Sequence, residues 1–355
     1  MKKKILKFIG WFFGIILGIA FAIFLAFQLS PRPGAFLINH MFSNTVQITD
    51  KKTFDQAEKN VAKKTDLTYE SKYKENTYDI YYPKNSKGPV PVLFWVHGGG
   101  FVGGDKSGVK EFATKLVSDA NIAVVAMNYE LAPDSEYPNQ VLQVNELIKD
   151  LLAEEKDDKL LDMEQLFFGG DSAGSQIALQ YAAIQTNDAY AKQMKIKQLL
   201  PKDSLKGTIS YCGPVDLKLT AQQHSDDRFM KFFVKTVAWS LIGTKDWKTS
   251  EQLKEASVAD HVSKEFPPTY ITDGNAYSFQ EQGQALENRL TELKVPVQSL
   301  FYTDTKKEIT HEYQFDYTLK ESQNCYQQTL DFVNKYKGSL SIRTDGLYKI
   351  KSGSE

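Results

Sequence analysis

Residues 167–174 read FFGGDSAG and join a short apolar run to a helix-like stretch. Residues 170–174 fit the pattern Gly-x-Ser-x-Gly, with Ser172 at the centre. A sharp strand-to-helix turn needs such glycines, because a neighbouring Cβ would clash there, and it exposes the serine hydroxyl at the end of a sheet. An ordinary glycine-rich turn gives the same pattern, but the apolar strand before it and the apolar helix after it favour a nucleophile at Ser172.

Short apolar runs alternate with helix-like stretches on both sides of this turn. The expected strands lie at residues 90–96, 122–127, 166–168, 207–212, 269–272 and 297–302. The expected helices lie at residues 109–120, 140–152, 172–185 and 279–293. Residues 77–82 alternate polar and apolar side chains, which predicts an antiparallel edge strand. This pattern predicts an α/β fold with a mostly parallel central sheet and helices on both faces.

A run of three glycines, residues 97–101 (HGGGF), follows the most apolar expected strand. Consecutive glycines allow backbone N–H groups to turn toward a carbonyl oxygen that becomes negatively charged during a reaction. We expect the amides of Gly99, Gly100 and Ala173 to form such an oxyanion hole. A phosphate-binding loop is the alternative, but no Gly-Lys-Ser/Thr follows the glycines.

The base that activates the serine is sought among the histidines. They are His40, His97, His224, His261 and His311. Only His311 follows the last expected strand, where the order nucleophile, acid, histidine places the base in this kind of fold. A histidine on a surface loop is the alternative interpretation. We therefore expect His311 to be the base.

These motifs resemble the hormone-sensitive-lipase branch of the α/β hydrolases, a family of carboxylesterases and lipases. The resemblance rests on HGGGF at 97–101, NYELAP at 128–133 with Tyr137-Pro138, GDSAG at 170–174 and His311. It covers roughly residues 66–336 and implies the α/β-hydrolase fold and hydrolysis of carboxylic esters.

The acid of the triad is the point where the chain departs from that family. In the family a strand, a glycine and two further residues lead to a catalytic aspartate, and here that position is Tyr277. A tyrosine is neutral near pH 7 and does not stabilise an imidazolium as a carboxylate does. Asp273, at the end of the same expected strand, is the nearest replacement. Asp216, after the preceding strand, is the alternative acid.

About fifty residues separate Asp216 from Pro267, too many for a plain loop between a helix and a strand. This insertion, at about residues 217–266, is rich in aromatic side chains and predicts a helical cap. The cap can bury these residues against the sheet and can also shape an apolar pocket for an acyl group, and we favour the combination of the two. We expect Phe101 and Trp239 to contact substrate.

The N-terminus predicts one transmembrane helix. Residues 8–27 carry no charged side chain, and at 1.5 Å per residue they span the roughly 30 Å of a bilayer core. Four lysines precede the run, so the positive-inside rule places the N-terminus in the cytoplasm and the rest of the chain outside. A cleaved signal peptide is the alternative, but its apolar region is shorter, about 7–15 residues, and Phe27-Gln28-Leu29-Ser30 is a poor cleavage site.

This organisation gives an anchor at residues 1–30, a spacer at 31–65, a catalytic domain at 66–337 and a polar tail at 338–355. The polar residues 51–64 of the spacer are compatible with an amphipathic helix. Cys212 and Cys325 are far apart and form no CxxC pair, so we expect two buried free thiols, with one disulfide as the alternative.

The charge composition of the chain excludes one class of function. A formal net charge of −1 argues against a nucleic-acid-binding protein, which needs a basic face. The sequence therefore predicts a membrane-anchored serine hydrolase that acts on small-molecule or lipid esters and needs no metal or organic cofactor. The alternatives are a peptidase or amidase of the same fold and a catalytically weak, membrane-tethered binding protein. The sequence leaves the oligomeric state open.

Overall fold

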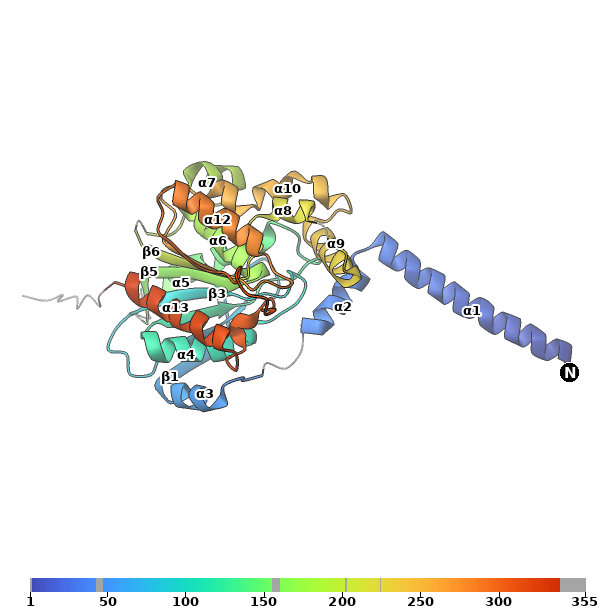
Figure 1. The fold of residues 1–355 in the computed structure, drawn as a ribbon, viewed down its shortest axis with the longest axis horizontal. Coiled ribbons are helices and arrows are strands. Elements are labelled where there is room, and N and C mark those ends of the chain that lie inside the picture. The colour runs from blue at the N-terminus through green and yellow to red at the C-terminus, as the bar shows by residue number, and fades with distance from the viewer. Residues whose placement is uncertain (1, 43–46, 155–159, 202, 224, 339–355) are drawn as a thin grey trace, which may run out of the picture.

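The computed structural model describes residues 2–42, 47–154, 160–201, 203–223 and 225–338. His224 and the tail beyond residue 338 lie outside these residues. The chain forms an eight-stranded sheet in the order β1-β2-β4-β3-β5-β6-β7-β8 (Figure 1). The strands are β1 (Val61–Thr68), β2 (Thr77–Pro83), β3 (Val90–Val96), β4 (Ala123–Met127), β5 (Leu161–Asp171), β6 (Leu205–Tyr211), β7 (Thr269–Thr272) and β8 (Val297–Leu300).

The sheet is parallel from β4 to β8, whereas β2 pairs antiparallel with both β1 and β4. Helices cover both faces. α4 (Lys110–Ala120) and α13 (Lys320–Tyr336) pack on one face, and α5 (Asn139–Glu154), α6 (Ala173–Thr186) and α12 (Gln280–Glu292) pack on the other. This architecture confirms the predicted α/β-hydrolase fold class.

The central strand β3 shows how the core is divided. Val92, Phe94 and Val96 belong to the hydrophobic cluster on one face of the sheet. Leu93 and Trp95 belong to the cluster on the other face. Side chains alternate between the two faces of a strand, so a run of apolar residues packs against helices on both faces.

The cap lies between β6 and β7 as predicted. Its helices are α8 (Leu217–Gln222), α9 (Arg228–Ile242), the 3-10 helix η3 (Trp247–Thr249), α10 (Glu251–Glu255) and α11 (Val258–His261). α7 (Asp188–Met194) and the 3-10 helices η2 (Lys106–Val109) and η4 (Tyr313–Phe315) complete the domain.

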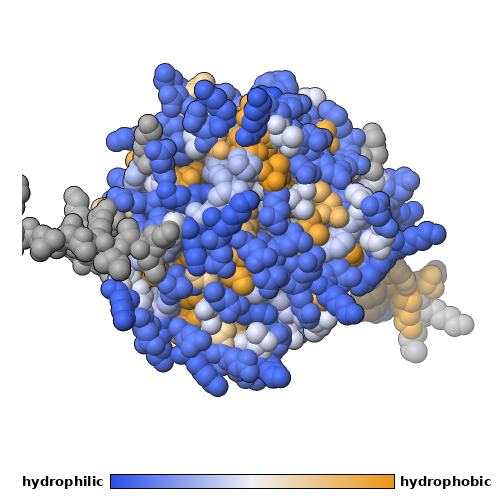
Figure 2. All heavy atoms as spheres, turned by 60° about the vertical axis from the view of Figure 1, so that its left-hand side comes forward, coloured by the Kyte–Doolittle hydropathy of each residue, from blue (hydrophilic) through white to orange (hydrophobic). Residues whose placement is uncertain are grey.

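The N-terminal helix α1 (Lys2–Leu29) projects from the globular domain beside α2 (Arg32–Phe42) and α9 (Figure 1). Its segment Lys4–Leu29 contains an 18-residue window that has a mean hydropathy of 2.5 and is not buried. The segment therefore has the length and composition of a membrane span or of a signal sequence. The face of the domain in Figure 2 is mainly hydrophilic, and α1 extends behind it.

The predicted spacer is folded as part of the domain. α2 packs on α9, and Gly34 makes this approach possible because a Cβ there would lie 2.7 Å from Thr236 Cγ2. The helix expected at 51–64 is shorter than predicted. It consists of α3 (Lys51–Ala57) and the 3-10 helix η1 (Glu58–Asn60), and β1 begins directly after them. β1 is an edge strand in which Lys63 is exposed and Lys64 is half-buried, so a polar composition is compatible with a strand here. It crosses the boundary predicted at residue 66, so the sheet begins at Val61.

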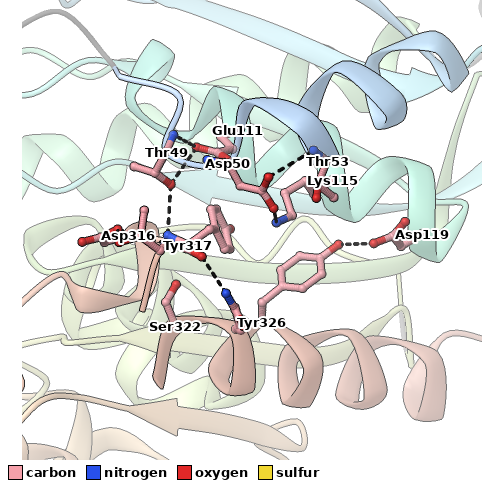
Figure 3. Close-up of polar contacts among 12 residues, drawn as sticks. Thr49, Asp50, Thr53, Glu111, Lys115, Asp119, Asp316, Tyr317, Ser322 and Tyr326 are labelled. Carbon is pink, nitrogen blue, oxygen red and sulfur yellow. Dashed lines mark hydrogen bonds and ion pairs between the residues drawn. The ribbon is translucent and has the colours of Figure 1, made fainter. Parts of the chain in front are cut away.

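Residues that follow α2 bind two distant parts of the domain (Figure 3). The backbone N–H groups of Thr49 and Asp50 donate to the buried carboxylate of Glu111 in α4, at 2.7 and 2.8 Å. Thr49 Oγ1 also accepts a hydrogen bond from Tyr317 N, at 3.0 Å. We call the contacts of Thr49 and Asp50 with Glu111 and Tyr317 the N-terminal clasp. It joins the start of the domain to α4 and to the loop that precedes α13.

Candidate active site

Ser172 lies at the turn between β5 and α6. Its φ of 48° is positive, a strained value for a residue with a side chain, as a nucleophile turn requires. A Cβ on Gly170 would lie 2.4 Å from the Gly174 carbonyl carbon, and one on Gly174 would lie 2.0 Å from Val96 O. Only glycine fits at these two positions, so the sequence pattern is explained by close approach of the backbone.

The imidazole of His311 lies against this serine. Its Nε2 is 2.9 Å from Ser172 Oγ, which is hydrogen-bond distance. The Phe279 ring packs edge-on against the imidazole, with centroids 5.5 Å apart. The two residues predicted as nucleophile and base are therefore brought together.

A short backbone pairing brings Asp273 to the other side of the imidazole. The N–H of Ala276 donates to Ile309 O at 3.1 Å, and His311 N donates back to Ala276 O at 3.0 Å. Gly274 permits this approach, because a Cβ there would lie 2.1 Å from Ile309 O. As a result, Asp273 Oδ1 lies 3.7 Å from His311 Nδ1.

The carboxylate of Asp273 acts on His311 by charge. The 3.7 Å separation is longer than a hydrogen bond, and Nδ1 has no hydrogen-bond partner among the described residues. The carboxylate instead accepts from the N–H groups of Gly274 and Phe279, at 2.7 and 2.6 Å. Burial lowers the pKa of His311, but the nearby carboxylates, Asp273 first, outweigh it and hold that pKa above its ordinary 6.5.

The alternative acid, Asp216, has different neighbours. Its Oδ1 lies 3.9 Å from Lys218 Nζ and makes no hydrogen bond within the described part of the chain. Its backbone N–H donates to Gln282 Oε1 at 3.0 Å. Asp273 is the better placed of the two predicted acids to face His311.

The glycine loop after β3 adopts the left-handed backbone expected of an oxyanion loop. φ is 112° at Gly99 and 60° at Gly100. A Cβ on Gly99 would lie 2.2 Å from Gly103 O, which only glycine avoids. The third predicted donor, Ala173, is the first residue of α6 and directly follows the nucleophile. The loop and the start of the helix thus bring the three predicted amide donors into one region.

Asp171 is a site residue that the sequence analysis did not assign. Its two carboxylate oxygens accept from Trp95 Nε1 and from Gly98 N, each at 2.7 Å. Burial raises its pKa to about 6, although both donors favour the charged form. Asp171 therefore ties the serine turn to the glycine loop. Its position beside Ser172 was visible in the sequence, but its partners are 73 and 76 residues away.

Glu312 is a second carboxylate at the site that was not predicted. Its Oε1 lies 3.9 Å from His311 Nε2, on the side of the imidazole that faces Ser172. Burial and the negative charge of Asp171 raise the pKa of Glu312, to about 8, although 37% of its side chain stays accessible to water. The carboxyl group is therefore protonated more readily than an ordinary glutamate. The only feature of the sequence that could have identified Glu312 as a site residue is its position directly after His311.

A cleft of about 1120 Å³ opens between the cap and the loop that precedes α12. Its apolar lining includes Met230, Val234, Trp247, Tyr277 and Phe279. Phe279 connects the cleft to the site, since its ring also touches the imidazole of His311. The predicted substrate contacts lie elsewhere: Phe101 and Trp239 are 4% and 8% exposed and pack in the core.

Three potential metal ligands meet at the site. Atoms of Cys212, Asp273 and His311 lie within 4.8 Å of one another. Both cysteines are free and buried, and burial raises the pKa of the Cys212 thiol well above its ordinary value. His311 Nε2 is within hydrogen-bond distance of Ser172 Oγ, and both oxygens of Asp273 accept backbone N–H groups. Two of the three side chains are therefore already used by the Ser172–His311 site.

Comparisons with known proteins agree with this fold. A family model described as BD-FAE matches residues 78–290, more than half of the chain. The putative alpha/beta hydrolase R526 of Acanthamoeba polyphaga mimivirus is 25% identical over 227 residues, which cover 62% of this chain and 61% of that protein. The versiconal hemiacetal acetate esterase of Dothistroma septosporum is 27% identical over 242 residues, which cover 63% and 68%.

A plant relative and two solved structures extend the comparison. The probable carboxylesterase 6 of Arabidopsis thaliana is 35% identical over 117 residues, 29% of this chain and 34% of that protein. Esterase B from Lactobacillus rhamnosis superposes with a TM-score of 0.67 at 19% identity, over 86% of this chain and 96% of the other. A bacterial heroin esterase gives 0.63 at 19% identity, over 86% and 98%. At these identities the two structures show a shared fold.

Proposed function

The chain belongs to the BD-FAE family, and on this premise we propose that it is a membrane-anchored serine hydrolase that cleaves carboxylic esters. One observation carries the proposal: His311 Nε2 lies 2.9 Å from Ser172 Oγ at a strained strand-to-helix turn. The relatives named as esterases favour an ester over an amide as the substrate.

The reaction we propose proceeds through an acyl-enzyme. Ser172 Oγ attacks the ester carbonyl while His311 Nε2 takes its proton. The amides of Gly99, Gly100 and Ala173 stabilise the oxyanion, each donor contributing about 2.7–4 kcal/mol. Asp273 stabilises the imidazolium that forms. His311 then protonates the leaving alcohol, and water, activated by the same imidazole, hydrolyses the acyl-enzyme and restores Ser172.

Replacing the nucleophile tests the proposal. We expect Ser172→Ala to lower kcat for short p-nitrophenyl esters by about 10⁴–10⁶-fold and to abolish labelling by a fluorophosphonate. Ser118→Ala, on the outer side of α4, is the matched control and should keep both. Wild-type turnover by folded Ser172→Ala would refute the mechanism. An unlabelled wild-type protein would point to a binding protein instead.

A pair of substrates separates an esterase from an amidase. A p-nitrophenyl ester and the p-nitroanilide of the same acyl group present the same acyl chain with different leaving groups. We expect turnover of the ester and little turnover of the anilide. Faster cleavage of the anilide would favour a peptidase or amidase.

The membrane part of the proposal places α1 across the cell membrane in a single pass. Lys4 and Lys7 precede the apolar run, so we expect the N-terminus in the cytoplasm and the catalytic domain outside. Protease added to intact spheroplasts should digest the catalytic domain. Digestion only after lysis would reverse the orientation, and a soluble mature form would indicate signal cleavage.

A further inference from the structure

Helix α2 is apolar on both of its sides. Gly34, Ala35 and Ile38 are buried against the domain. On the outer side, Phe36 is 72% exposed and Leu37 is 48% exposed. A surface helix of a globular protein ordinarily presents polar residues to water, so this outer side requires a further partner.

The short connection between α1 and α2 limits how far the outer side of α2 can lie from the membrane. α1 ends at Leu29 and α2 begins at Arg32, so two residues join them and span at most about 10 Å. The segment Lys4–Leu29 is about 39 Å long at 1.5 Å per residue, longer than a bilayer core of roughly 30 Å. When α1 crosses a membrane, its end lies among the lipid headgroups, and α2 begins at that depth.

The cap shares this region. The ring of Phe27, near the end of α1, lies 6.5 Å from the ring of Phe232 in α9. Phe229, at the start of α9, is 45% exposed, and its ring lies tilted against that of Phe233, with centroids 6.1 Å apart. The face in Figure 2, from which α1 points away, is by contrast mainly hydrophilic. The exposed apolar side chains of α9 therefore lie next to the apolar end of α1.

We propose that the outer side of α2, with Phe229 of α9, is a lipid-binding face that lies in the headgroup region of the bilayer crossed by α1. The proposal rests on the membrane anchoring proposed above. An apolar helix side that lies along the interface, attached to a transmembrane span, is a stable arrangement because lipid covers what water would otherwise contact. The lipid-binding face is defined here as Phe36, Leu37, Met41 and Phe229, which are all exposed.

This face connects directly to the glycine loop. Asn39 of α2 donates through Nδ2 to Val102 O at 2.8 Å. A Cβ on Gly103 would lie 3.1 Å from the Cα of Asn39, and one on Gly100 would lie 3.1 Å from Phe233 Cζ in α9. The helices that would rest on lipid are therefore those that cover the predicted oxyanion hole.

Site-specific fluorescence tests the lipid-binding face. Cys212 and Cys325 are 1% and 0% exposed, so a thiol-reactive NBD dye should react with an introduced cysteine alone. The full-length variants are Leu37→Cys on the face, Ile15→Cys in α1 and Gln327→Cys on α13. Each is reconstituted in phosphatidylcholine vesicles without bromine, with bromine near the top of the acyl chains, or with bromine near their ends. Phe36→Cys replaces Leu37→Cys if thermal melting shows that the latter does not fold.

We expect bromine to quench the dye at Leu37→Cys and at Ile15→Cys and to leave Gln327→Cys unchanged. Quenching at Ile15→Cys without quenching at Leu37→Cys would overturn the lipid-binding face and leave the anchor standing. No quenching at either position would overturn both the anchor and the face. A blue shift at Leu37→Cys that needs high protein density and is insensitive to bromine would show that a second copy covers the face, which would also overturn the proposal.

Discussion

Replacing Asp273 by asparagine removes one negative charge and leaves the shape of the side chain. The charge acts on His311 across the 3.7 Å between Oδ1 and Nδ1, without a hydrogen bond. The N–H groups of Gly274 and Phe279 donate to different oxygens of the carboxylate, so asparagine can accept from only one of them. The change therefore removes the charge together with one supporting hydrogen bond.

The magnitude follows from that distance. Two unit charges this far apart interact with about 4 kcal/mol at the effective dielectric constant of roughly 20 that suits protein sites. The imidazolium forms during the reaction, so we expect Asp273→Asn to lower kcat by about 10³-fold, since each 1.36 kcal/mol is tenfold. KM should change little, because the carboxylate faces His311 rather than the cleft.

The pH profile provides the specific signature. His311 must be neutral to accept the proton of Ser172, and nearby carboxylates hold its pKa above 6.5. Wild-type activity should therefore fall as the pH drops through a value above 6.5. In Asp273→Asn this acid limb should shift to lower pH, which a mere loss of folding would not produce.

The assay compares Asp273→Asn and Asp216→Asn on p-nitrophenyl acetate, with thermal melts to check folding. Asp216→Asn should keep kcat within a small factor. The opposite pattern would refute the role of Asp273 and assign the acid to Asp216, after the end of β6. Full activity in both variants would reduce the site to Ser172 and His311.

Two further changes test residues that the sequence did not mark. Glu312→Gln should extend activity on the alkaline side. Ionisation of Glu312 near pH 8 places a negative charge 3.9 Å from His311 Nε2, beside the reacting serine, and this charge opposes formation of the oxyanion. Identical alkaline limbs in kcat/KM of the wild type and the variant would contradict this role. Glu111→Gln should lower the free energy of unfolding by about 1.5–3 kcal/mol, the value of a hydrogen bond to a charged group, and leave kcat nearly unchanged. Urea titration measures this free energy of unfolding. Glu251→Gln is the control, because the side chain of Glu251 is 82% exposed. Equal stability of the two variants would show that the N-terminal clasp does not contribute to stability.

Many of the strands could be predicted from the local pattern of apolar and polar residues. The predicted strands at 90–96 and 269–272 coincide with β3 and β7. Both strands are buried along their whole length, and both are rich in the apolar and β-branched side chains that favour strands. β1 was missed for the opposite reason: an edge strand with one solvent-facing side can carry many lysines. Its membership of the sheet is decided by pairing with β2, which no local pattern reports.

The site was predictable where residue spacing along the chain fixes geometry. The serine turn is local, so Ser172 and its glycines could be found from a short segment. The choice of Asp273 over Asp216 depended on the pairing of Ala276 with Ile309, which lies 33 residues further along the chain. The roles of Asp171 and Glu312 depend on partners from other strands, and sequence order alone does not reveal them.

The clasp and α2 also decide where α1 can be removed without loss of contacts that support the domain. A protease that cut at Ser30 or Pro31 would separate α1 and leave α2, Thr49 and Asp50 in place. Such a shed form would keep the support of its glycine loop and the link to Tyr317. A cut after residue 60 would also remove α1, but the remaining fragment would lack both supports. For preparing the enzyme without α1, the chain should therefore start at Ser30 rather than at the first residue of the sheet.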